Sequence, residues 1–182
     1  MTPWQLRQAV KCIQQGGIIA YPTEAVFGLG CDPLDLDAVE SICSLKHRSL
    51  EQGLILIVSR LDQARPYTTA SDTQLKKLQK KTSRPITWLL PKSDLCPPWI
   101  TGQYDSIAIR CTTHPIALQL CEYTGQALVS TSANISRHPP AQNARDVRRI
   151  FGNNINIILH DDTGNQTKPS EIRDLISGKK LR

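Results

Sequence analysis

Polar and glycine residues follow directly after a short apolar run near the N-terminus. The run at residues 17–21 leads into Thr23 and Glu24, and Gly28 and Gly30 come shortly afterwards. Hydroxyl and carboxylate groups at the end of a strand can contact a ligand, and glycine lets a ligand approach the main chain because it has no Cβ atom. The same pattern also fits an ordinary exit from a strand into a loop, since glycines in a GxG spacing are a weak signal.

Two cations, Lys46 and Arg48, stand on either side of His47, just before an apolar run at residues 54–58. Lysine presents a point charge and arginine a two-pronged donor, so the pair suits a polyanion such as a triphosphate. The alternative is that both cations only stabilise the carbonyl end of a helix through its dipole. We interpret His47 as a bystander rather than a base.

A third polar group follows the apolar residues 127–129. It reads Ser-Thr-Ser-Ala-Asn over residues 130–134. In open α/β sheets ligands lie in the crevice beyond the strand ends, so hydroxyl and amide groups there are expected to bind phosphate or ribose. An ordinary turn with Asn134 in the left-handed region is the alternative. The density of polar side chains favours a site.

Several common nucleotide and hydrolase motifs are missing from the sequence. Neither GxxxxGK[ST] nor a GxGxxG that opens a helix is present, and HExxH and GxSxG are absent as well. Any nucleotide must therefore be held by a less common arrangement.

The elements that must position these residues alternate between helices and short, mostly buried strands. Helices are predicted over residues 4–15, from Asp35 or Asp37 to about Lys46, and over 71–81, 114–123 and 143–151. Strands are predicted over residues 17–21, 54–58, 85–91, 106–110, 127–129 and 155–159. The glycine-containing residues after the first strand, and residues 92–103, are expected to be loops. This order predicts an α/β fold with a single-domain, twisted open mixed sheet flanked by helices, over residues 1–182.

Composition and charge exclude several classes. The chain has 182 residues, 40% of them hydrophobic, which is typical of a soluble globular protein. A formal net charge of +6 points to anionic ligands such as nucleotide, phosphate or nucleic acid. Aromatic residues make up only 5%, which argues against a stacking platform for single strands. A merely basic soluble protein is the remaining interpretation of the charge.

The six cysteines are widely spaced and contain no CxxC pair, so we expect reduced, structural thiols and no metal site. No apolar run approaches the ~20 residues of a membrane helix. The N-terminus lacks the pattern of a signal peptide, so a cytoplasmic location is expected.

The motifs occur in order over almost the whole chain. They are Tyr21-Pro22-Thr23-Glu24 with Phe27-Gly28-Leu29-Gly30, Lys46-His47-Arg48, Gly53-Leu54-Ile55-Leu56-Ile57, Thr101-Gly102 with Asp105-Ser106, Arg110, Ser130-Thr131-Ser132-Ala133-Asn134 and Pro169-Ser170-Glu171-Ile172-Arg173-Asp174. Each is weak alone, but the ordered set resembles the YrdC/TsaC family, the threonylcarbamoyl-AMP synthases of the tRNA t6A pathway. The length fits the short, single-domain form of that family.

The resemblance implies an enzyme of the nucleotidyltransferase type. L-threonine and bicarbonate would form a carbamate, whose carboxylate attacks the α-phosphate of ATP to give L-threonylcarbamoyladenylate and pyrophosphate. A transferase machinery would then move the threonylcarbamoyl group to adenosine 37 of tRNAs that read ANN codons. The implied fold is YrdC-like, with a concave basic face.

The family's pattern also implies roles for single residues. Catalysis and triphosphate binding fall to Lys46 and Arg48, further ATP binding to Ser132, Asn134 and Arg182, and threonine binding to Thr23, Arg110, Ser130 and Ser170. ATP is a substrate, Mg²⁺ arrives with its phosphates, and no metal site of the protein itself is implied. Fixed cations and Mg²⁺ can stabilise the charge of nucleotidyl transfer without a covalent nucleophile.

Departures from the family's pattern affect loops. Ser83-Arg84-Pro85 stands where Gly-Pro is usual, Arg137 stands where a glycine usually follows the SxN segment, and Glu171 follows Ser170 where many relatives have threonine. The first two put the local loop geometry in doubt, and Arg137 could add a phosphate contact.

Two alternatives belong to other classes. One is a non-catalytic factor that binds tRNA or other double-stranded RNA, or acts in ribosome maturation, through the same basic face. A pure binder would have no reason to keep Lys46, Arg48, Ser132 and Asn134 together. The other is a carbamoyl-adenylate enzyme of the hydrogenase-maturation type, in which this domain is embedded in a much longer chain.

Overall fold

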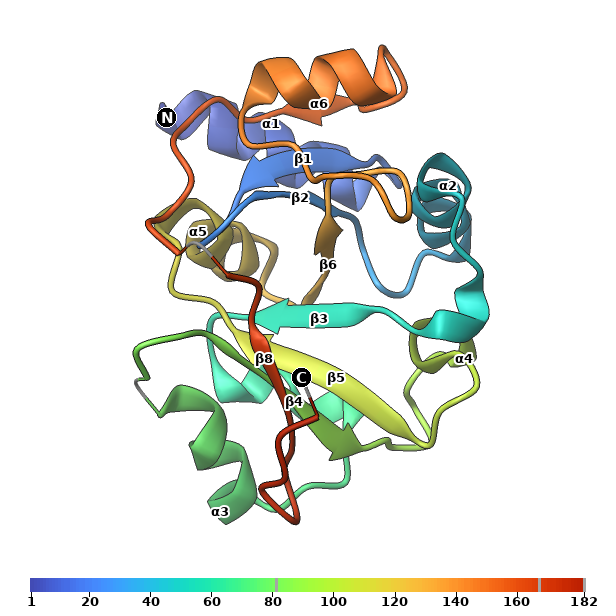
Figure 1. Ribbon diagram of the computed structural model, residues 1–182, viewed down its shortest axis with the longest axis vertical. Helices are drawn as coiled ribbons and strands as arrows, with labels where there is room; N and C mark the ends of the chain where they lie inside the picture. The colour runs from blue at the N-terminus through green and yellow to red at the C-terminus, as the bar shows by residue number, and fades with distance from the viewer. Residues whose placement is uncertain (81, 167, 182) are drawn as a thin grey trace.

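The protein is described here by a computed structural model that covers residues 1–80, 82–166 and 168–181. Within these residues one mixed sheet has the strand order β7-β1-β2-β6-β3-β5-β4-β8 (Figure 1). The strands are β1 (Ile19–Pro22), β2 (Phe27–Gly30), β3 (Ile55–Val58), β4 (Ile86–Pro91), β5 (Ser106–Cys111), β6 (Leu128–Ser132), β7 (Ile157–Ile158) and β8 (Glu171–Asp174). The pairs β7–β1, β3–β5 and β4–β8 are parallel and the others antiparallel, which confirms the predicted α/β fold with a mixed sheet.

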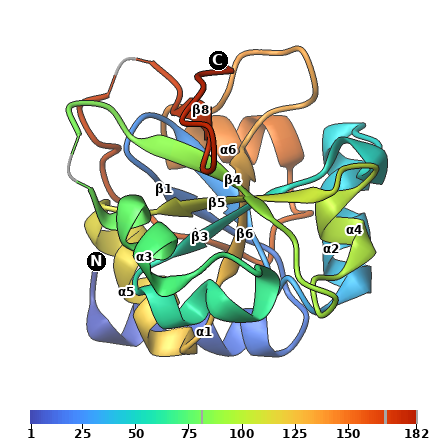
Figure 2. The same ribbon diagram turned by 90° about the horizontal axis from the view of Figure 1, so that it is seen from below.

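Helices cover the sheet on more than one side. They are α1 (Pro3–Gln14), α2 (Leu36–Lys46), α3 (Asp72–Leu75), α4 (Pro98–Thr101), α5 (Pro115–Thr124) and α6 (Ala144–Phe151), with 3₁₀ turns at Leu50–Gln52, Leu61–Gln63, Arg65–Tyr67 and Lys76–Gln79. Figure 2 shows α1 and α5 on one side of the sheet and the C-terminal segment with β8 on the opposite side. Helices α1 and α5 belong to one apolar cluster, and α2 and α6 belong to the other. Adjacent strand residues such as Leu56 and Ile57 are divided between the two clusters, so helices pack on both faces of the sheet.

Local sequence explains where the main helices begin and end. Thr2 and Gln5 form a capping box at the start of α1, which buries an apolar stripe against the sheet and α5. Asp35 Oδ1 accepts a hydrogen bond from the Ala38 amide at 3.0 Å and caps α2, as one of the two predicted candidates. At the other end of α2, His47 adopts the left-handed backbone conformation with φ of 50° and ends the helix.

Strand β6 joins the two parts of the sheet. Its last residues, Thr131 and Ser132, pair with β2, and its first residues, 128–130, pair with β3. In Figure 1 it lies between the β1–β2 pair above and the β3–β5–β4–β8 group below. Ser130 to Ser132 thus belong to the strand, which was predicted to end at residue 129; pairing with β3 and then with β2 extends it.

The glycine-rich stretch after the first strand is also a strand and not the expected loop. Residues 27–30 form β2, which pairs antiparallel with β1 through a tight turn in which the Thr23 amide donates to Val26 O at 3.0 Å. A Cβ atom on Gly30 would lie 2.8 Å from the Tyr21 ring and 2.8 Å from Val129 O. Gly30 therefore makes room for protein neighbours, whereas Gly28 lines the cavity described below.

Other boundaries differ from the predictions as well. The helix expected at 71–81 is a four-residue α3 followed by a 3₁₀ turn, and Lys81 lies outside the described residues. The loop 92–103 contains α4, the strand expected at 155–159 shrinks to the two-residue β7, and the tail supplies β8. Short elements of this kind depend on tertiary contacts more than on local pattern.

All six cysteines lie in the described part of the chain and are free thiols. Burial raises the pKa of the Cys121 thiol to about 12, so this side chain is a neutral apolar group at neutral pH. Among the described residues, no helix combines the length and the apolar character needed to cross a membrane.

Candidate active site

A cavity of about 1330 Å³ is lined by residues of the sheet and by residues of the C-terminal segment, such as Gly164, Ser170 and Ile172. Its lining includes most of the residues predicted to bind substrate, namely Thr23, Arg48, Arg110, Ser130, Ser132, Asn134 and Ser170. Segments distant in sequence therefore converge on one site, as the ordered motifs predict.

The alternation of strand residues explains how the floor of the cavity is built. Along β5, Ile107 and Ile109 are fully buried, while Ala108 and Arg110 point the other way, into the cavity. Leu89 pairs with Ala108, Ala108 with Ile55, and Ile55 with Ser130, so one row of cavity residues crosses four strands. Ala108 and Ser130, the two small side chains of this row, leave space above the sheet.

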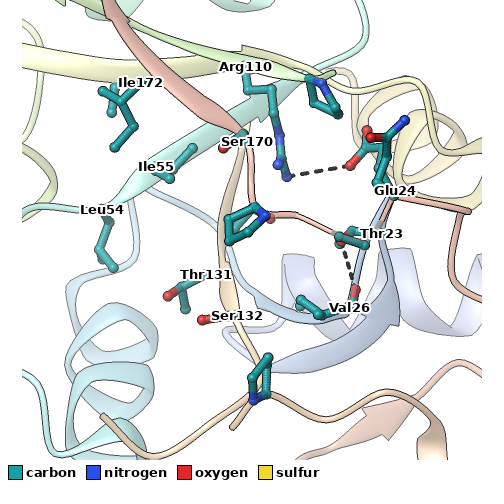
Figure 3. Close-up of a pocket in the computed structure, with 18 of the residues that line it drawn as sticks. Thr23, Glu24, Val26, Leu54, Ile55, Arg110, Thr131, Ser132, Ser170 and Ile172 are labelled. Carbon is teal, nitrogen blue, oxygen red and sulfur yellow. Dashed lines mark hydrogen bonds and ion pairs between the residues drawn. The ribbon is translucent and has the colours of Figure 1, made fainter. Parts of the chain in front are cut away.

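One end of the cavity gathers hydroxyl groups around a guanidinium. Figure 3 shows Arg110, Glu24, Thr23 and Ser170 on one side of the cavity, with Thr131 and Ser132 further away. The Thr23 hydroxyl donates to Val26 O at 2.7 Å, and Ser170 Oγ lies 2.9 Å from Thr87 Oγ1. The Thr23 hydroxyl thus already helps to build the β1–β2 turn and reaches a ligand only as an acceptor.

Glu24 was not singled out as a site residue in the sequence, although it follows the predicted Thr23. It is 6% exposed, and its Oε2 lies 3.7 Å from Arg110 Nη2. Burial acts to raise the pKa of the Glu24 carboxyl, but the Arg110 charge and hydrogen bonds from residues 112 and 113 outweigh it, so the pKa lies below the usual value. Its partners lie 86 or more positions away along the chain, so no local pattern could reveal them.

At the other end of the cavity, Arg48 lies beside the residues that lead into strand β3. Its Nη2 donates to Gly53 O at 2.8 Å and to Gln52 O at 3.2 Å, which aligns the guanidinium along the wall. Its buried Nε has no hydrogen-bond partner among the residues that the structure describes. Part of the fork is therefore anchored, and part is left for an anion.

Lys46 is in a different position from the one predicted. It is 2% exposed and is not part of the cavity lining. Its Nζ donates to Ser132 O, to Asn134 O at 2.9 Å and to Asn134 Oδ1 at 3.3 Å. All three of its N–H donors are thus directed to Ser132 and Asn134, which line the cavity. Lys46 holds this segment from behind.

The segment 132–134 is ordered internally as well. Ser132 Oγ donates to Asn134 Oδ1 at 2.6 Å, and Asn134 Nδ2 donates to Ile135 O and His138 O. The Ser136 amide donates to Lys46 O at 2.8 Å, so the chain after β6 is fixed to the end of α2. Lys46 and Ser132, which belong to two motifs 86 residues apart, are therefore in direct contact.

Charge in the cavity favours anions. The cationic side chains in its lining are Arg48, Arg110 and Lys168, and the one acidic side chain among the described lining residues is Glu24. Burial, followed by the Arg48 charge, lowers the pKa of Lys46 to about 8. A concave basic face that extends beyond the cavity stays a prediction.

The remaining predicted positions lie outside this cluster. Arg182 lies outside the described residues, although its neighbour Leu181 lines the cavity. Arg137 is exposed, does not line the cavity and has φ of 68°, the left-handed conformation that favours glycine at this position. Arg84 Nε donates to Pro169 O at 2.7 Å and thereby fixes the tail beside β4. Among the described residues, no three His, Cys, Asp or Glu side chains group together as metal ligands.

The loop before the tail covers the cavity by close backbone contact. The Gly164 amide donates to Thr23 O at 2.9 Å, and a Cβ atom on Gly164 would lie 2.6 Å from Glu24 O. We expect Gly164→Ala to lower the free energy of unfolding by about 1–3 kcal/mol, because the loop or the β1–β2 turn must move apart. Urea denaturation measures this. Asn165→Ala, an exposed neighbour, is the control and should change it by less than about 0.5 kcal/mol; equal losses in the two variants would contradict the close contact.

The chain is similar to a known protein family and to curated proteins over nearly its whole length. The model of the Sua5/YciO/YrdC family, described as "Telomere recombination", matches residues 11–182. A threonylcarbamoyl-AMP synthase of Cellvibrio japonicus is 45% identical over 187 residues, covering 100% of this chain and 99% of the relative. A threonylcarbamoyl-AMP synthase of Nitrosococcus oceani is 48% identical over 182 residues, covering 98% of this chain and 97% of the relative.

A solved structure is similar over nearly the same span. The crystal structure of P. abyssi Sua5 complexed with L-threonine has a TM-score of 0.88 and 32% identity to this chain. The match covers 96% of this chain and 52% of that chain, so the protein spans about half the length of that Sua5.

Proposed function

The chain belongs to the Sua5/YciO/YrdC family, and from this premise we propose that it is a nucleotidyltransferase that makes L-threonylcarbamoyladenylate from L-threonine, bicarbonate and ATP. Relatives that match it from end to end carry the name of this synthase, and a similar solved structure binds L-threonine. The observation that carries the proposal is that Arg110 and Arg48 line one cavity, and that the buried Nε atom of each has no hydrogen-bond partner within the described residues.

The amino-acid subsite is the end of the cavity with Arg110, Thr23, Ser130 and Ser170. A guanidinium fork matches the geometry of a carboxylate, so Arg110 binds the α-carboxylate of threonine. Thr23, Ser130 and Ser170 are 5–7% exposed and supply oxygen atoms around it. A wall lined by such hydroxyl groups discriminates between amino acids by its shape and by its hydrogen bonds.

The nucleotide subsite is the opposite end, where Arg48, Ser132 and Asn134 meet. Arg48 binds the phosphates with the part of its fork that the protein does not use, and Ser132 and Asn134 complete the ATP site. Lys46 acts from behind this segment: its three donors hold residues 132–134 in place, and its charge lies one layer below the phosphates. Arg182 would extend the ATP site from the tail.

The reaction follows from bringing the two subsites together. The threonine nitrogen attacks bicarbonate to give a carbamate and water, and a carbamate oxygen then attacks the α-phosphate while pyrophosphate leaves. Positioning and charge neutralisation dominate such a transfer. ATP enters as its Mg²⁺ complex; because the acidic side chain in the described lining, Glu24, is engaged with Arg110, the phosphates and not the protein hold this ion.

The product is an activated acyl adenylate that a second catalyst must consume. We propose that tRNA threonylcarbamoyl transferase machinery in the cytoplasm accepts it for t6A modification of adenosine 37. The alternative of a non-catalytic tRNA- or double-stranded-RNA-binding factor is less well supported, because the curated relatives that match the whole chain are named as synthases. The single domain over residues 1–182 is part of the same proposal.

The decisive experiment is a pyrophosphate-release assay with purified protein and Mg²⁺-ATP. Release is expected when L-threonine and bicarbonate are both present, and omission of either should abolish it, because the carbamate is the nucleophile. L-serine in place of L-threonine reports how far the side-chain methyl group is selected. Turnover that does not depend on threonine, or no turnover at all, would refute the proposed function.

A further inference from the structure

Glu24, the one acidic side chain in the described cavity lining, is held by several hydrogen bonds. Its Oε1 accepts hydrogen bonds from Thr112 Oγ1 at 2.8 Å, from the Thr113 amide at 2.8 Å and from the His114 amide at 3.3 Å. These donors lie in the turn that directly follows β5, the strand that carries Arg110. One oxygen atom of the carboxylate is therefore saturated and fixed in direction.

The other oxygen atom has a different environment. Glu24 Oε2 lies 3.7 Å from Arg110 Nη2, which is an ion pair but too long for a hydrogen bond. Both Glu24 Oε2 and Arg110 Nε are buried without a hydrogen-bond partner among the described residues. The carboxylate thus compensates the charge of the guanidinium without occupying its N–H groups.

This arrangement suits a receptor better than a structural salt bridge. A bidentate pair would satisfy the guanidinium with protein oxygens and leave little for a substrate. An arginine without any compensating charge would be costly to bury and would turn toward solvent. A charge held at 3.7 Å avoids both outcomes, because it attracts Arg110 to the wall and leaves its donors available.

We infer that Glu24 is the positioning residue of the amino-acid subsite, which holds the Arg110 fork in the direction of the substrate carboxylate. The inference rests on the proposed function and names a further residue of the same site. Glu24 touches Arg110 and not the reacting atoms, so it acts through the arginine. It also connects Arg110 to the cover of the cavity, since Glu24 O accepts a hydrogen bond from the Gln166 amide at 3.0 Å.

The test compares binding of L-threonine and L-threoninamide to the full chain by isothermal titration calorimetry. The amide keeps every group of threonine except the carboxylate. In the wild type, threonine is expected to bind far more tightly than the amide. In Glu24→Gln, Oε1 and its hydrogen bonds can remain, but an NH₂ group replaces the oxygen that faces Arg110. Threonine affinity should fall by about 30-fold or more, and amide affinity should hardly change.

A matched variant separates positioning from structural support. Thr112→Val removes one hydrogen bond to Oε1 but keeps the charge beside Arg110, so the ratio of threonine to threoninamide affinity should stay close to that of the wild type. A second control is Glu24→Gln in an Arg110→Ala background, where no further loss of threonine affinity is expected because the arginine it positions is gone.

The outcomes are distinct. If Glu24→Gln keeps the wild-type affinity ratio, or if Thr112→Val loses it equally, Glu24 only supports the fold and the inference is wrong while the proposed function stands. If the wild type does not bind threonine, the proposed function and the inference both fail. Should Glu24→Gln not fold, as judged by circular dichroism, Glu24→Asp withdraws the carboxylate from Arg110 by one methylene; an unchanged affinity ratio in that variant would equally overturn the inference.

Discussion

Arg48→Ala is expected to lower kcat/KM for threonine-dependent pyrophosphate release by about 100- to 1000-fold, a loss of about 2.7–4 kcal/mol in transition-state stabilisation. Arg48 lies in the cavity wall, and its fork is anchored on one side by Gly53 O and Gln52 O. Charge accumulates on the phosphates as the α-phosphate is attacked, and a preorganised cation stabilises that charge without having to reorganise. Steady-state assays with ATP varied at saturating threonine measure the loss.

The control for this variant is Arg60→Ala. Arg60 is exposed and pairs with Asp62 away from the cavity, so its removal should leave kcat/KM within about twofold of the wild type, as is usual for surface positions. Threonine binding, measured by calorimetry, should persist in Arg48→Ala, because the amino-acid subsite lies at the other end of the cavity. A near-wild-type rate in Arg48→Ala would mean that the triphosphate lies elsewhere.

Lys46→Met is expected to have the second large effect, on stability as well as on activity. The substitution removes a buried charge and the three hydrogen bonds that Lys46 Nζ donates to Ser132 and Asn134. Removing one partner of a buried hydrogen bond costs about 1–3 kcal/mol, so the free energy of unfolding in urea should fall by that order. Activity should fall too, because the segment 132–134 then loses its fixed position.

The pH dependence of the wild type gives an independent check on Lys46. Its pKa is about 8 in the folded protein and 10.5 in the unfolded chain. Between these values the unfolded chain holds a proton that the folded protein has released, so this group makes the free energy of unfolding rise with pH. Activity should instead decline as pH passes 8, since the neutral amine has lost its charge and one donor.

Lys46→Met should be less active than the wild type, and its activity should not decline further as the pH passes 8. Lys11→Met, at an exposed position in the last turn of α1, should keep both the stability and the pH profile of the wild type. A wild-type urea midpoint in Lys46→Met would contradict the role assigned to its three hydrogen bonds.

Much of the fold could be predicted because its longer elements carry strong local signals. Helix α1 has a capping box and a regular apolar stripe, and α5 ends at Gly125 in the left-handed conformation, as the sequence indicates. Strand β2 could not be predicted, because its two glycines disfavour strands locally. It forms because β1 and β6 pair with it on both edges, and because Gly30 leaves room for the Tyr21 ring.

For the candidate site, too, some features could be predicted from the sequence and others could not. The Lys-x-Arg and Ser-x-Asn motifs predicted segments that the fold brings together, since Arg48, Ser132 and Asn134 line one cavity; that they bind an anion stays a prediction. The sequence could not tell that Lys46 faces Ser132 and Asn134 and not the cavity, because that depends on how α2 packs beside β6. The sequence could not assign a role to Glu24, because its partners Arg110 and Thr112 come from another strand and the turn that follows it.

Strand β6 carries one member of each subsite. Ser130 and Ser132 both line the cavity and are two residues apart on the same strand, so their Cα atoms are separated by about 6.6–6.8 Å. Under the proposed assignment of the subsites, the distance between the amino acid and the nucleotide is set by the covalent geometry of a single extended peptide, and not by how two domains or loops dock.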